Sequence, residues 1–457
     1  MEELDGVKGL VKKLDDHISK EIEEELSADD IADILKELKE ENGELYLEYL
    51  HKLDVESIST AAIEMPEHML EDMLNEFSKD KLVNVLEELE SDDQLELLEY
   101  LHEIDEDKTK IIFDELDEED KQDILKLSSY DEDMAGSYMQ VEVLRGYLDE
   151  TVMEAVDRLR DLRHRDEIET VYQLFIVDEN DVLKYAIPLY DLIIYNFSLT
   201  IEEVIKSAPE DAFKPKFARD HDDIAEVARK FQEFDLSVLP VVDSRGVLVG
   251  RITTDDIHDF IQEQATEQIY SMVGVDDEVE EEDYSILRAG KSRAVWLLFN
   301  LFTAFLSSAI IGLFDATIEA YVALAVLMPI VASMGGNTGS QALTVTVRRL
   351  ALGDIEFSDA KRVIKREVGI ALINGTIFAI LVGVVAWAWF KAPLLGVVIA
   401  MAMLINLSCA GLFGAIIPLT LKKFNIDPAV GSSVLLTAAT DIIGFFSFLG
   451  LATWIIL

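Results

Sequence analysis

Hydrophobic residues in the last third of the chain form five long runs, which predict membrane-spanning helices. The runs cover residues 294–314, 320–347, 368–390, 393–421 and 434–457. Each run reaches the roughly 20 residues that an α-helix needs to cross the hydrocarbon core of a bilayer. The pattern therefore predicts an all-α polytopic membrane domain over residues 293–457, with five transmembrane helices.

Basic residues between these runs predict the orientation of the domain. They lie before the first run, between the second and third runs and between the fourth and fifth, whereas the remaining loops carry only Lys391. Loops rich in Lys and Arg stay on the cytoplasmic side of a membrane. We therefore expect a multi-pass protein of the plasma or inner membrane with a cytoplasmic N-terminus and an extracytoplasmic C-terminus.

Residues 1–138 have a shorter pattern, with hydrophobic positions at helical spacing interrupted by polar restarts. Two restarts begin at Ser27 and Ser91. The second, with Gln94 three residues after Ser91, matches a capping box, in which a serine caps the helix. The pattern predicts an acidic all-α domain of helical hairpins stacked as a small solenoid.

From about Met139 the pattern changes to short β runs that alternate with helices. Residues 174–177 and 238–242 are apolar runs, and each is followed directly by an Asp, a turn and a second strand. They predict two α/β units, at 139–208 and 209–262. A connecting helix with its linker, over residues 256–292, then leads to the membrane domain.

Charge is distributed unevenly between the two halves. Residues 293–457 contain 10 Lys and Arg and 8 Asp and Glu, whereas the whole chain contains 39 and 90, so residues 1–292 contain 29 and 82 and carry a net charge of −53. Such a surface repels nucleic acid and anionic lipid and attracts cations. Solubility and adaptation to a saline cytoplasm also favour acidic surfaces, so individual positions are more informative than the total.

Asp441 is the single acidic residue of the last apolar run. A carboxylate at that depth is costly and usually marks a path for ions or protons. The alternative is a structural pairing with another helix, but no Lys, Arg or His lies inside the other apolar runs. Asp441 is therefore our first candidate for an ion-binding residue.

The second apolar run contains a polar, glycine-rich segment at residues 335–341, Gly-Gly-Asn-Thr-Gly-Ser-Gln. Close packing of small residues between helices explains the glycines. It does not explain Asn337 and Gln341, whose amides need a polar cavity in the bilayer. A phosphate-binding loop is excluded because no Gly-Lys-Ser/Thr follows.

Other motifs limit the class of protein. The chain has one cysteine, Cys409, and therefore no internal disulfide, and its polar, acidic N-terminus lacks the features of a signal peptide. It has no His-Glu-x-x-His motif and no Cys/His cluster. We expect no enzyme and no catalytic residues.

These segments together resemble a known family. The second α/β unit resembles a CBS domain, with its Gly-x-x-Thr-x-x-Asp pattern at Gly250, Thr253 and Asp256, whereas the first has Pro188 at the Thr position. The order of an acidic helical domain, a CBS pair, a connecting helix and five membrane helices with the 335–341 segment resembles the MgtE family of magnesium channels. Asp427-Pro428-Ala429, fourteen residues before Asp441, also matches that family.

The resemblance implies a homodimer with its pore between the subunits. Asp441 would face the dimer axis and recognise Mg²⁺, and the pore residues are expected to be Asp441, Asn337, Gln341 and Gly336. Thr253 and Asp256 match the positions where the CBS pair binds adenine nucleotide such as ATP.

The resemblance also implies that cytosolic Mg²⁺ between the acidic domains and the connecting helix closes the pore. The matching positions are Asp223, Asp235, Asp256, Asp259 and Glu267, with Asp427 on the membrane side. For each acid alone, a solvated surface charge is the simpler interpretation. Gln264 is neutral where the family has an acid, and Ser433-Val434 stand where the family has a proline.

Three classes of function remain open from sequence. The first is a Mg²⁺-gated Mg²⁺ channel, and the second is a carrier, for example Na⁺-coupled, or a transporter that also accepts Mn²⁺ or Co²⁺. The third is a membrane-anchored nucleotide sensor. An anchor does not need Asn337, Gln341 and Asp441 in the membrane, so transport is favoured.

Overall fold

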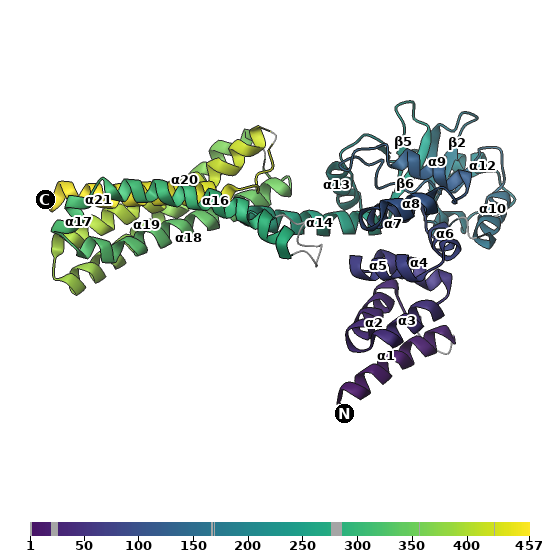
Figure 1. The fold of residues 1–457 in the computed structure, drawn as a ribbon. Coiled ribbons are helices and arrows are strands. Elements are labelled where there is room, and N and C mark those ends of the chain that lie inside the picture. Colours follow the sequence, from purple (N-terminus) through teal and green to yellow (C-terminus); the bar gives the residue numbers. More distant parts are fainter. Residues whose placement is uncertain are drawn as a thin grey trace. The chain divides into compact units, whose positions relative to one another are not determined.

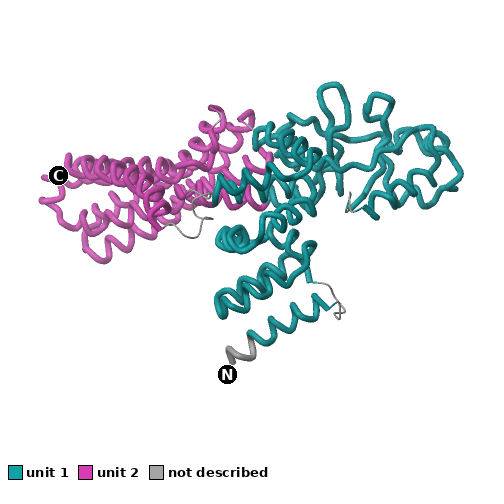
Figure 2. The backbone as a smooth tube through the Cα atoms, turned by 45° about the vertical axis from the view of Figure 1, so that its right-hand side comes forward, with its two compact units in different colours: residues 1–261 teal, residues 262–457 magenta. Residues whose placement is uncertain are grey.

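The computed structural model describes residues 2–19, 26–165, 168, 170–275, 286–355, 357–424 and 426–457. Within them the chain forms two compact units, residues 1–261 and 262–457 (Figure 2). Helix α14 (Thr254–Val273) begins in the first unit and ends in the second.

Short amphipathic helices form the N-terminal part of the first unit (Figure 1). They are α1 (Glu2–Ile18), α2 (Ala28–Glu41), α3 (Gly43–Lys52), α4 (Val55–Ile63), α5 (Glu67–Glu76), α6 (Lys79–Glu87), α7 (Ser91–Ile104), α8 (Glu106–Phe113) and α9 (Glu118–Leu127). This confirms the all-α prediction for the N-terminal domain. Polar side chains separate several of these helices: Asn42, Asp54, Ser78 and Asp117 each accept a hydrogen bond from one of the first N–H groups of the helix that follows.

The capping box is present at Ser27, where Asp30 completes the reciprocal pair, and not at Ser91 as predicted. Glu90 is the N-cap residue of α7 and makes no side-chain capping bond. The Ser91 hydroxyl donates instead to Glu142 (2.9 Å) and accepts from the Val141 N–H (3.0 Å). Ser91 therefore bonds to residues about 50 positions away and not to Gln94 in its own helix. Sequence spacing cannot reveal such a distant partner.

Two α/β units follow, and the described residues of each form a three-stranded sheet. The first contains β1 (Arg145–Gly146), α10 (Val152–His164), β2 (Gln173–Val177), β3 (Leu183–Pro188), α11 (Leu189–Leu192) and α12 (Ile201–Ser207). The second contains β4 (Ala218–Arg219), α13 (Ile224–Phe234), β5 (Val238–Val242), β6 (Leu248–Thr253) and the start of α14. In both sheets the first pair of strands is parallel and the second antiparallel, so the two units repeat one topology.

The N-terminal helices and the second α/β unit share one hydrophobic core. Ile58 of α4, Leu97 of α7, Leu239 of β5 and Ile257 of α14 are all buried in it. The first α/β unit has a core of its own, which includes Leu174. The first turns of α14 are therefore held against the N-terminal helices by apolar packing.

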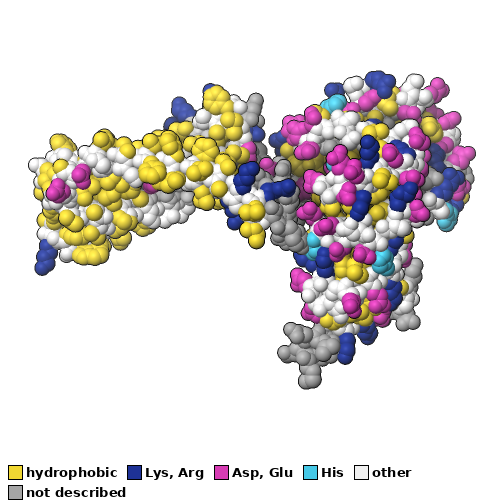
Figure 3. Space-filling model, viewed as in Figure 1, with side chains coloured by type: hydrophobic (Ala, Val, Ile, Leu, Met, Phe, Trp, Pro, Cys, Tyr) yellow, Lys and Arg dark blue, Asp and Glu magenta, His cyan; other side chains and the backbone are white. Residues whose placement is uncertain are grey.

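Long helices form the second unit. They are α16 (Ile286–Gly312), the short α17 (Asp315–Ala320), α18 (Ala323–Ala351), the 3-10 turn η1 (Phe357–Asp359), α19 (Ala360–Phe390), α20 (Pro393–Lys423) and α21 (Ser432–Ile455). Helix α20 is central and packs against α18, α19 and α21, and α21 also packs against α16. Large apolar side chains such as Phe302 and Trp389 are exposed, and hydrophobic groups cover the visible face of these helices (Figure 3). Such a surface suits contact with lipid.

Among the described residues, four helical segments are long and apolar enough to cross a membrane: α16, η1 with α19, α20 and α21. The predicted count of five is therefore not confirmed. Helix α18 falls short because the Ser, Gly, Asn and Gln residues of its middle lower the mean hydropathy. It is nevertheless 29 residues long and packs against both α20 and α21.

Candidate ion pathway and regulatory acids

The residues of the glycine-rich segment lie on two faces of helix α18. Gly335 and Gly339 are buried against neighbouring helices, as the packing interpretation predicts. The other face is exposed and polar, and it consists of Ser333, Asn337, Ser340, Gln341 and Thr344. We call these five residues the α18 polar face. A Cβ at Gly336 would meet nothing within 4 Å, so the backbone there is also accessible.

Asp441 lies on α21, which packs against α18. Its side chain is half-buried, and Thr437, one turn earlier, is exposed. The Thr437 hydroxyl donates to the Ser433 carbonyl of the same helix at 2.8 Å, whereas Thr440 is buried. Both helices therefore carry polar groups outside their packed faces.

One chain by itself does not complete an ion site at this place. In the described part of the chain, no hydrogen bond or ion pair joins Asp441 to Asn337 or Gln341, and no three Asp, Glu, His or Cys side chains are grouped to hold a metal ion. A bare polar face in hydrocarbon is unfavourable. The α18 polar face therefore needs either water or another protein surface over it.

The end of α14 contacts the loop that precedes α21. The Gly431 N–H points to the Ser271 carbonyl at 3.4 Å, and Met272 packs near Ala429. Asp427 lies in the middle of this loop, and its carboxylate accepts from the Ala429 N–H (2.9 Å). The predicted Asp427 position is thus placed in a loop that α14 contacts.

Trp296 of α16 lies against both partners of this contact. A Cβ added at Gly274 would lie 2.7 Å from its indole ring, and one added at Gly431 would lie 2.8 Å from the ring. The indole therefore packs directly on both glycines. The end of α14, the start of α21 and the first membrane helix meet at this side chain, and we call Trp296, Gly274 and Gly431 the Trp296 contact.

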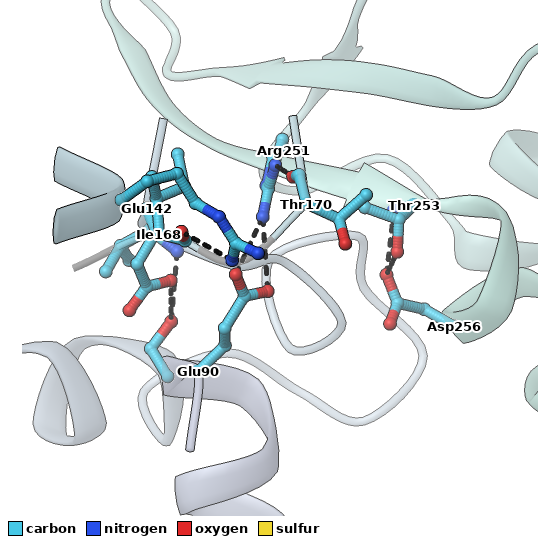
Figure 4. A network of polar contacts seen from close by, with 10 residues as sticks. Glu90, Glu142, Ile168, Thr170, Arg251, Thr253 and Asp256 are labelled. Atoms are coloured by element: carbon cyan, nitrogen blue, oxygen red, sulfur yellow. Dashed lines mark hydrogen bonds and ion pairs between the residues drawn. The ribbon is translucent and has the colours of Figure 1, made fainter. Parts of the chain in front are cut away.

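In the first unit, Arg251 of β6 organises a buried polar network (Figure 4). The side chain is 2% exposed, and its Nη2 donates to both carboxylate oxygens of Glu90, at 3.0 and 3.1 Å. Its Nη1 donates to the Thr170 carbonyl in the first α/β unit. Arg251 therefore ties together the N-terminal helices and both α/β units.

Thr253 and Asp256 form the cap of α14. The Asp256 carboxylate accepts from the Thr253 N–H (2.7 Å) and from its hydroxyl (2.8 Å), as Figure 4 shows. Burial raises the pKa of Asp256 to about 6, although the Thr253 hydrogen bonds act in the opposite direction. The charges of Asp255 and Glu90 raise it further.

Asp92, at the start of α7, is a residue that sequence reasoning missed. Its Oδ1 atom is buried and has no hydrogen-bond partner among the described residues. Burial raises its pKa well above the usual value, and the charge of Asp256 is the strongest of the neighbouring charges that raise it further. A buried carboxylate beside like charges is a position where a cation is favoured.

A second acidic group joins α14 to the N-terminal helices. It consists of Asp29 of α2, Glu64 at the end of α4 and Asp259 of α14. Burial raises the pKa of Glu64, followed by the charge of Asp29, a hydrogen bond to Asp29 and the charge of Asp259. Burial also raises the pKa of Asp259, followed by the charge of Asp255. Asp256 and Asp259 thus face acids that are distant in sequence.

Other predicted regulatory positions are not brought together. Asp223 is the N-cap of α13, where it accepts from the Ala225 N–H, and Asp235 is the left-handed C-cap of the same helix. At 1.5 Å per residue these ends are roughly 16 Å apart, so one ion cannot contact both within a chain. Glu267 is exposed on the last part of α14, in the second unit.

The donor chemistry of the acidic groups fits Mg²⁺. Mg²⁺ prefers carboxylate oxygens and keeps most of its water, so it is commonly held by only one or two carboxylates. Asp92 with Asp256, and Glu64 with Asp259, offer such pairs. The sequence contains the dipeptide Asp92-Asp93, but nothing in its spacing indicates that it meets Asp256.

Comparisons with known proteins agree with this division of the chain. Residues 328–451 match the sequence model of the MgtE divalent cation transporters, residues 47–133 the MgtE intracellular N domain and residues 210–263 the CBS domain. The magnesium transporter MgtE of Thermus thermophilus is 34% identical over 338 residues, 73% of this chain and 72% of that protein. The magnesium transporter MgtE of Bacillus subtilis is 30% identical over 432 residues, 94% and 92% of the two chains.

Two solved structures also resemble the chain. The cytosolic domain of the Mg²⁺ channel MgtE in complex with ATP has 30% identity and a TM-score of 0.46, and it covers 52% of this chain and 91% of that one. The soluble part of a magnesium transporter has 23% identity and a TM-score of 0.48, and it covers 57% and 99%.

The fold and its domains define a multi-pass membrane transporter of divalent cations with a helical N-terminal domain and a CBS domain. The chain matches these two relatives at 30% identity or more, and the matches cover most of their length, which decides the family. The chain belongs to the MgtE family of magnesium transporters, whose members are transporters and not enzymes.

Proposed function

We propose that this protein is a homodimeric Mg²⁺ channel whose opening is inhibited by cytosolic Mg²⁺. The observation that carries the pore assignment is the α18 polar face, exposed on a helix that packs against the Asp441 helix. A second copy related by a two-fold axis would cover this face and place two Asp441 carboxylates opposite each other. The N-terminus would be cytoplasmic, as the basic loops predict.

Chemistry supports Mg²⁺ as the transported ion. Mg²⁺ gives up its water reluctantly, so a pore that holds the hydrated ion needs oxygen acceptors at its wall and no tight cage. Two Asp441 carboxylates, the Asn337 and Gln341 amides and the accessible backbone at Gly336 provide such acceptors. Two carboxylates also balance the charge of one dication.

The two acidic groups at α14 support gating by the same ion. Without a cation, Asp92 and Glu64 repel Asp256 and Asp259, so the N-terminal helices and α14 tend to separate. Mg²⁺ between them would favour the packed arrangement. We infer that this arrangement holds the channel closed, which gives negative feedback.

The Trp296 contact offers a route from the sensor to the pore. Displacement of α14 would move Gly274, which follows the end of this helix. The Trp296 indole ring lies against both Gly274 and Gly431, and Gly431 immediately precedes α21. The remaining predicted positions, Asp223, Asp235, Glu267 and Asp427, stay candidates for further regulatory ions between subunits.

Adenine nucleotide at the CBS pair is a further part of the proposal. Thr253 and Asp256 match the ribose and phosphate positions of the CBS pattern, and a related cytosolic domain was solved with ATP. Because the two side chains bond to each other at the cap of α14, nucleotide binding there would act on the same helix as Mg²⁺.

Flux into proteoliposomes tests the proposed function. Mg²⁺ uptake should be inhibited when Mg²⁺ is present on the cytosolic side, and competition by Ca²⁺, Mn²⁺ and Co²⁺ measures selectivity. Single-channel current steps in a planar bilayer support a channel. Saturating uptake that requires Na⁺ and shows no current steps would instead establish a coupled carrier.

A further inference from the structure

Asn406 of α20 is a fully buried amide at the centre of the membrane unit. Its Nδ2 donates to the Val331 carbonyl of α18 at 2.8 Å. Its Oδ1 is also buried and has no hydrogen-bond partner among the described residues. A buried acceptor without a partner lowers stability, and a leucine would fill the same space without that loss. Folding alone therefore does not explain an asparagine here.

Two glycines make room for this amide, one on each neighbouring helix. A Cβ at Gly335 of α18 would lie 2.3 Å from Nδ2, and a Cβ at Gly444 of α21 would lie 2.7 Å from the same atom. Glycine inside a helix is unfavourable, so both positions indicate a need for close approach. The Asn406 amide is thus inserted between α18 and α21.

Each contact of Asn406 is adjacent to a residue of the proposed pore. Gly335 is two residues before Asn337, and Gly444 is three residues after Asp441. Because helix backbones transmit small shifts along a turn, the size and polarity of residue 406 set the spacing between α18 and α21 near both residues. Removal of the amide therefore alters the positions of Asn337 and Asp441 relative to each other.

We propose that Asn406 is a positioning residue for Mg²⁺ transport, which holds the Asn337 and Asp441 helices at the spacing that the ion requires. This inference rests on the pore assignment made above. Asn406 itself is placed away from the ion, because its amide is enclosed by α18, α20 and α21.

The test compares Asn406→Leu and Asn406→Ser with the full-length wild-type protein in proteoliposomes. Uptake is measured against Mg²⁺ concentration and with Ca²⁺ or Mn²⁺ as competitor. We expect the half-saturating Mg²⁺ concentration to rise roughly three- to tenfold, which corresponds to the loss of one interhelical hydrogen bond in a membrane. Selectivity against Ca²⁺ should fall in parallel.

A purely structural role predicts a different result: less folded protein and lower maximal flux, with unchanged half-saturation and selectivity. That result, in either variant, overturns the proposal. If Asn406→Leu does not fold, Asn406→Ser decides, because the smaller serine side chain cannot clash with the helices that pack on Gly335 and Gly444.

Asn300→Leu is the matched control, because in the described part of the chain the Asn300 amide bonds within its own helix, to the Trp296 carbonyl, and it should transport like wild type. Asp441→Ala separates the two hypotheses. Normal uptake by that variant refutes the pore assignment. The Asn406 variants have a different readout, the half-saturating Mg²⁺ concentration, so the two hypotheses can fail separately.

Discussion

Arg251 and Glu90 form a buried ion pair between residues that lie 161 positions apart in sequence. The guanidinium is 2% exposed, and the carboxylate side chain is 14% exposed. The pair fixes the start of α7 against β6 and α14, which brings Asp92 close enough to raise its pKa through the charge of Asp256. A structural pair thus creates the proposed regulatory site.

Replacement of Arg251 by methionine should destabilise the first unit, residues 1–261. Removal of the guanidinium takes away the Arg251 counter-charge of the buried Glu90 carboxylate, which costs about 3–5 kcal/mol. The first transition in thermal or urea unfolding of the full-length protein in detergent measures this loss. Arg229→Ala is the control, since its exposed pair with Glu226 should be worth less than about 1 kcal/mol. Equal stability of the two variants would show that the buried pair does not hold the unit together.

Asp92→Asn and Asp256→Asn should each make the channel less sensitive to cytosolic Mg²⁺. Each change removes one charge that attracts the ion, and we expect the inhibitory Mg²⁺ concentration to rise by roughly tenfold. Patch recordings or proteoliposome flux with varied internal Mg²⁺ provide the measurement. The double variant Asp256→Ala with Asp259→Ala should lose more of the inhibition than either acid alone.

The control for these variants is Glu202→Gln, which changes an exposed acid of α12 that pairs with Lys206. It should leave inhibition unchanged. Wild-type inhibition in Asp92→Asn and Asp256→Asn would refute the sensor assignment.

Asp441→Ala should abolish Mg²⁺ uptake while the protein remains folded and dimeric. Loss of two carboxylates from the proposed two-fold site removes the charge that balances the ion. Uptake in proteoliposomes and size-exclusion chromatography measure the two properties. Asp315→Ala, at the exposed start of α17, should keep its uptake. Unimpaired uptake by Asp441→Ala would contradict the pore assignment.

Mild acid should stabilise the cytosolic unit when Mg²⁺ is removed by chelation. Burial raises the pKa of Asp120 in α9 to about 6, and the charges of Asp117 and Glu87 add to this, whereas a hydrogen bond from Gln94 opposes it. A raised carboxyl pKa means that the folded state binds the proton more tightly than the unfolded state, so stability falls as pH rises through about 6.

The expected difference between pH 5 and pH 7.5 is about 1 kcal/mol for Asp120, after allowance for solvent at this half-buried site. Urea unfolding at the two pH values measures it, and Asp120→Asn should remove this part of the pH dependence. A pH dependence that Asp120→Asn leaves intact would assign the effect to Asp256 and the other raised acids.

Trp296→Ala should separate ion sensing from the pore. Without the indole, the end of α14 and Gly431 lose their common contact, so Mg²⁺ still binds the cytosolic acids but inhibits flux less. Flux with varied internal Mg²⁺, together with Mg²⁺ binding by calorimetry, measures both steps. Trp389→Ala, which removes an exposed indole of α19, serves as the control. Internal Mg²⁺ should inhibit flux through this variant as it does in the wild type. Normal inhibition in Trp296→Ala would exclude this route.

Much of the architecture could be predicted from local patterns. Long apolar runs, short amphipathic helices and alternating β runs each reflect how a segment partitions between water, lipid and a core, and this property depends on neighbouring residues. The number of membrane spans was the exception, because the polar residues that make α18 a candidate pore helix also lower its mean hydropathy. For the same reason, Asn337, Gln341 and Asp441 stood out as candidates: a polar residue in an apolar run is visible in sequence.

Hydropathy and periodicity are local properties, so the class of protein, its division into an acidic and an apolar half, and the polar residues of the membrane helices could all be read from the sequence. The grouping of the acids depends on the tertiary structure: Asp92 is near enough to Asp256 for its charge to raise the Asp92 pKa, whereas Asp223 and Asp235 lie at opposite ends of α13. The tertiary structure also decided that Gly335 accommodates Asn406 while Asn337 stays exposed. These relationships depend on packing between segments far apart in the chain, which no local pattern contains.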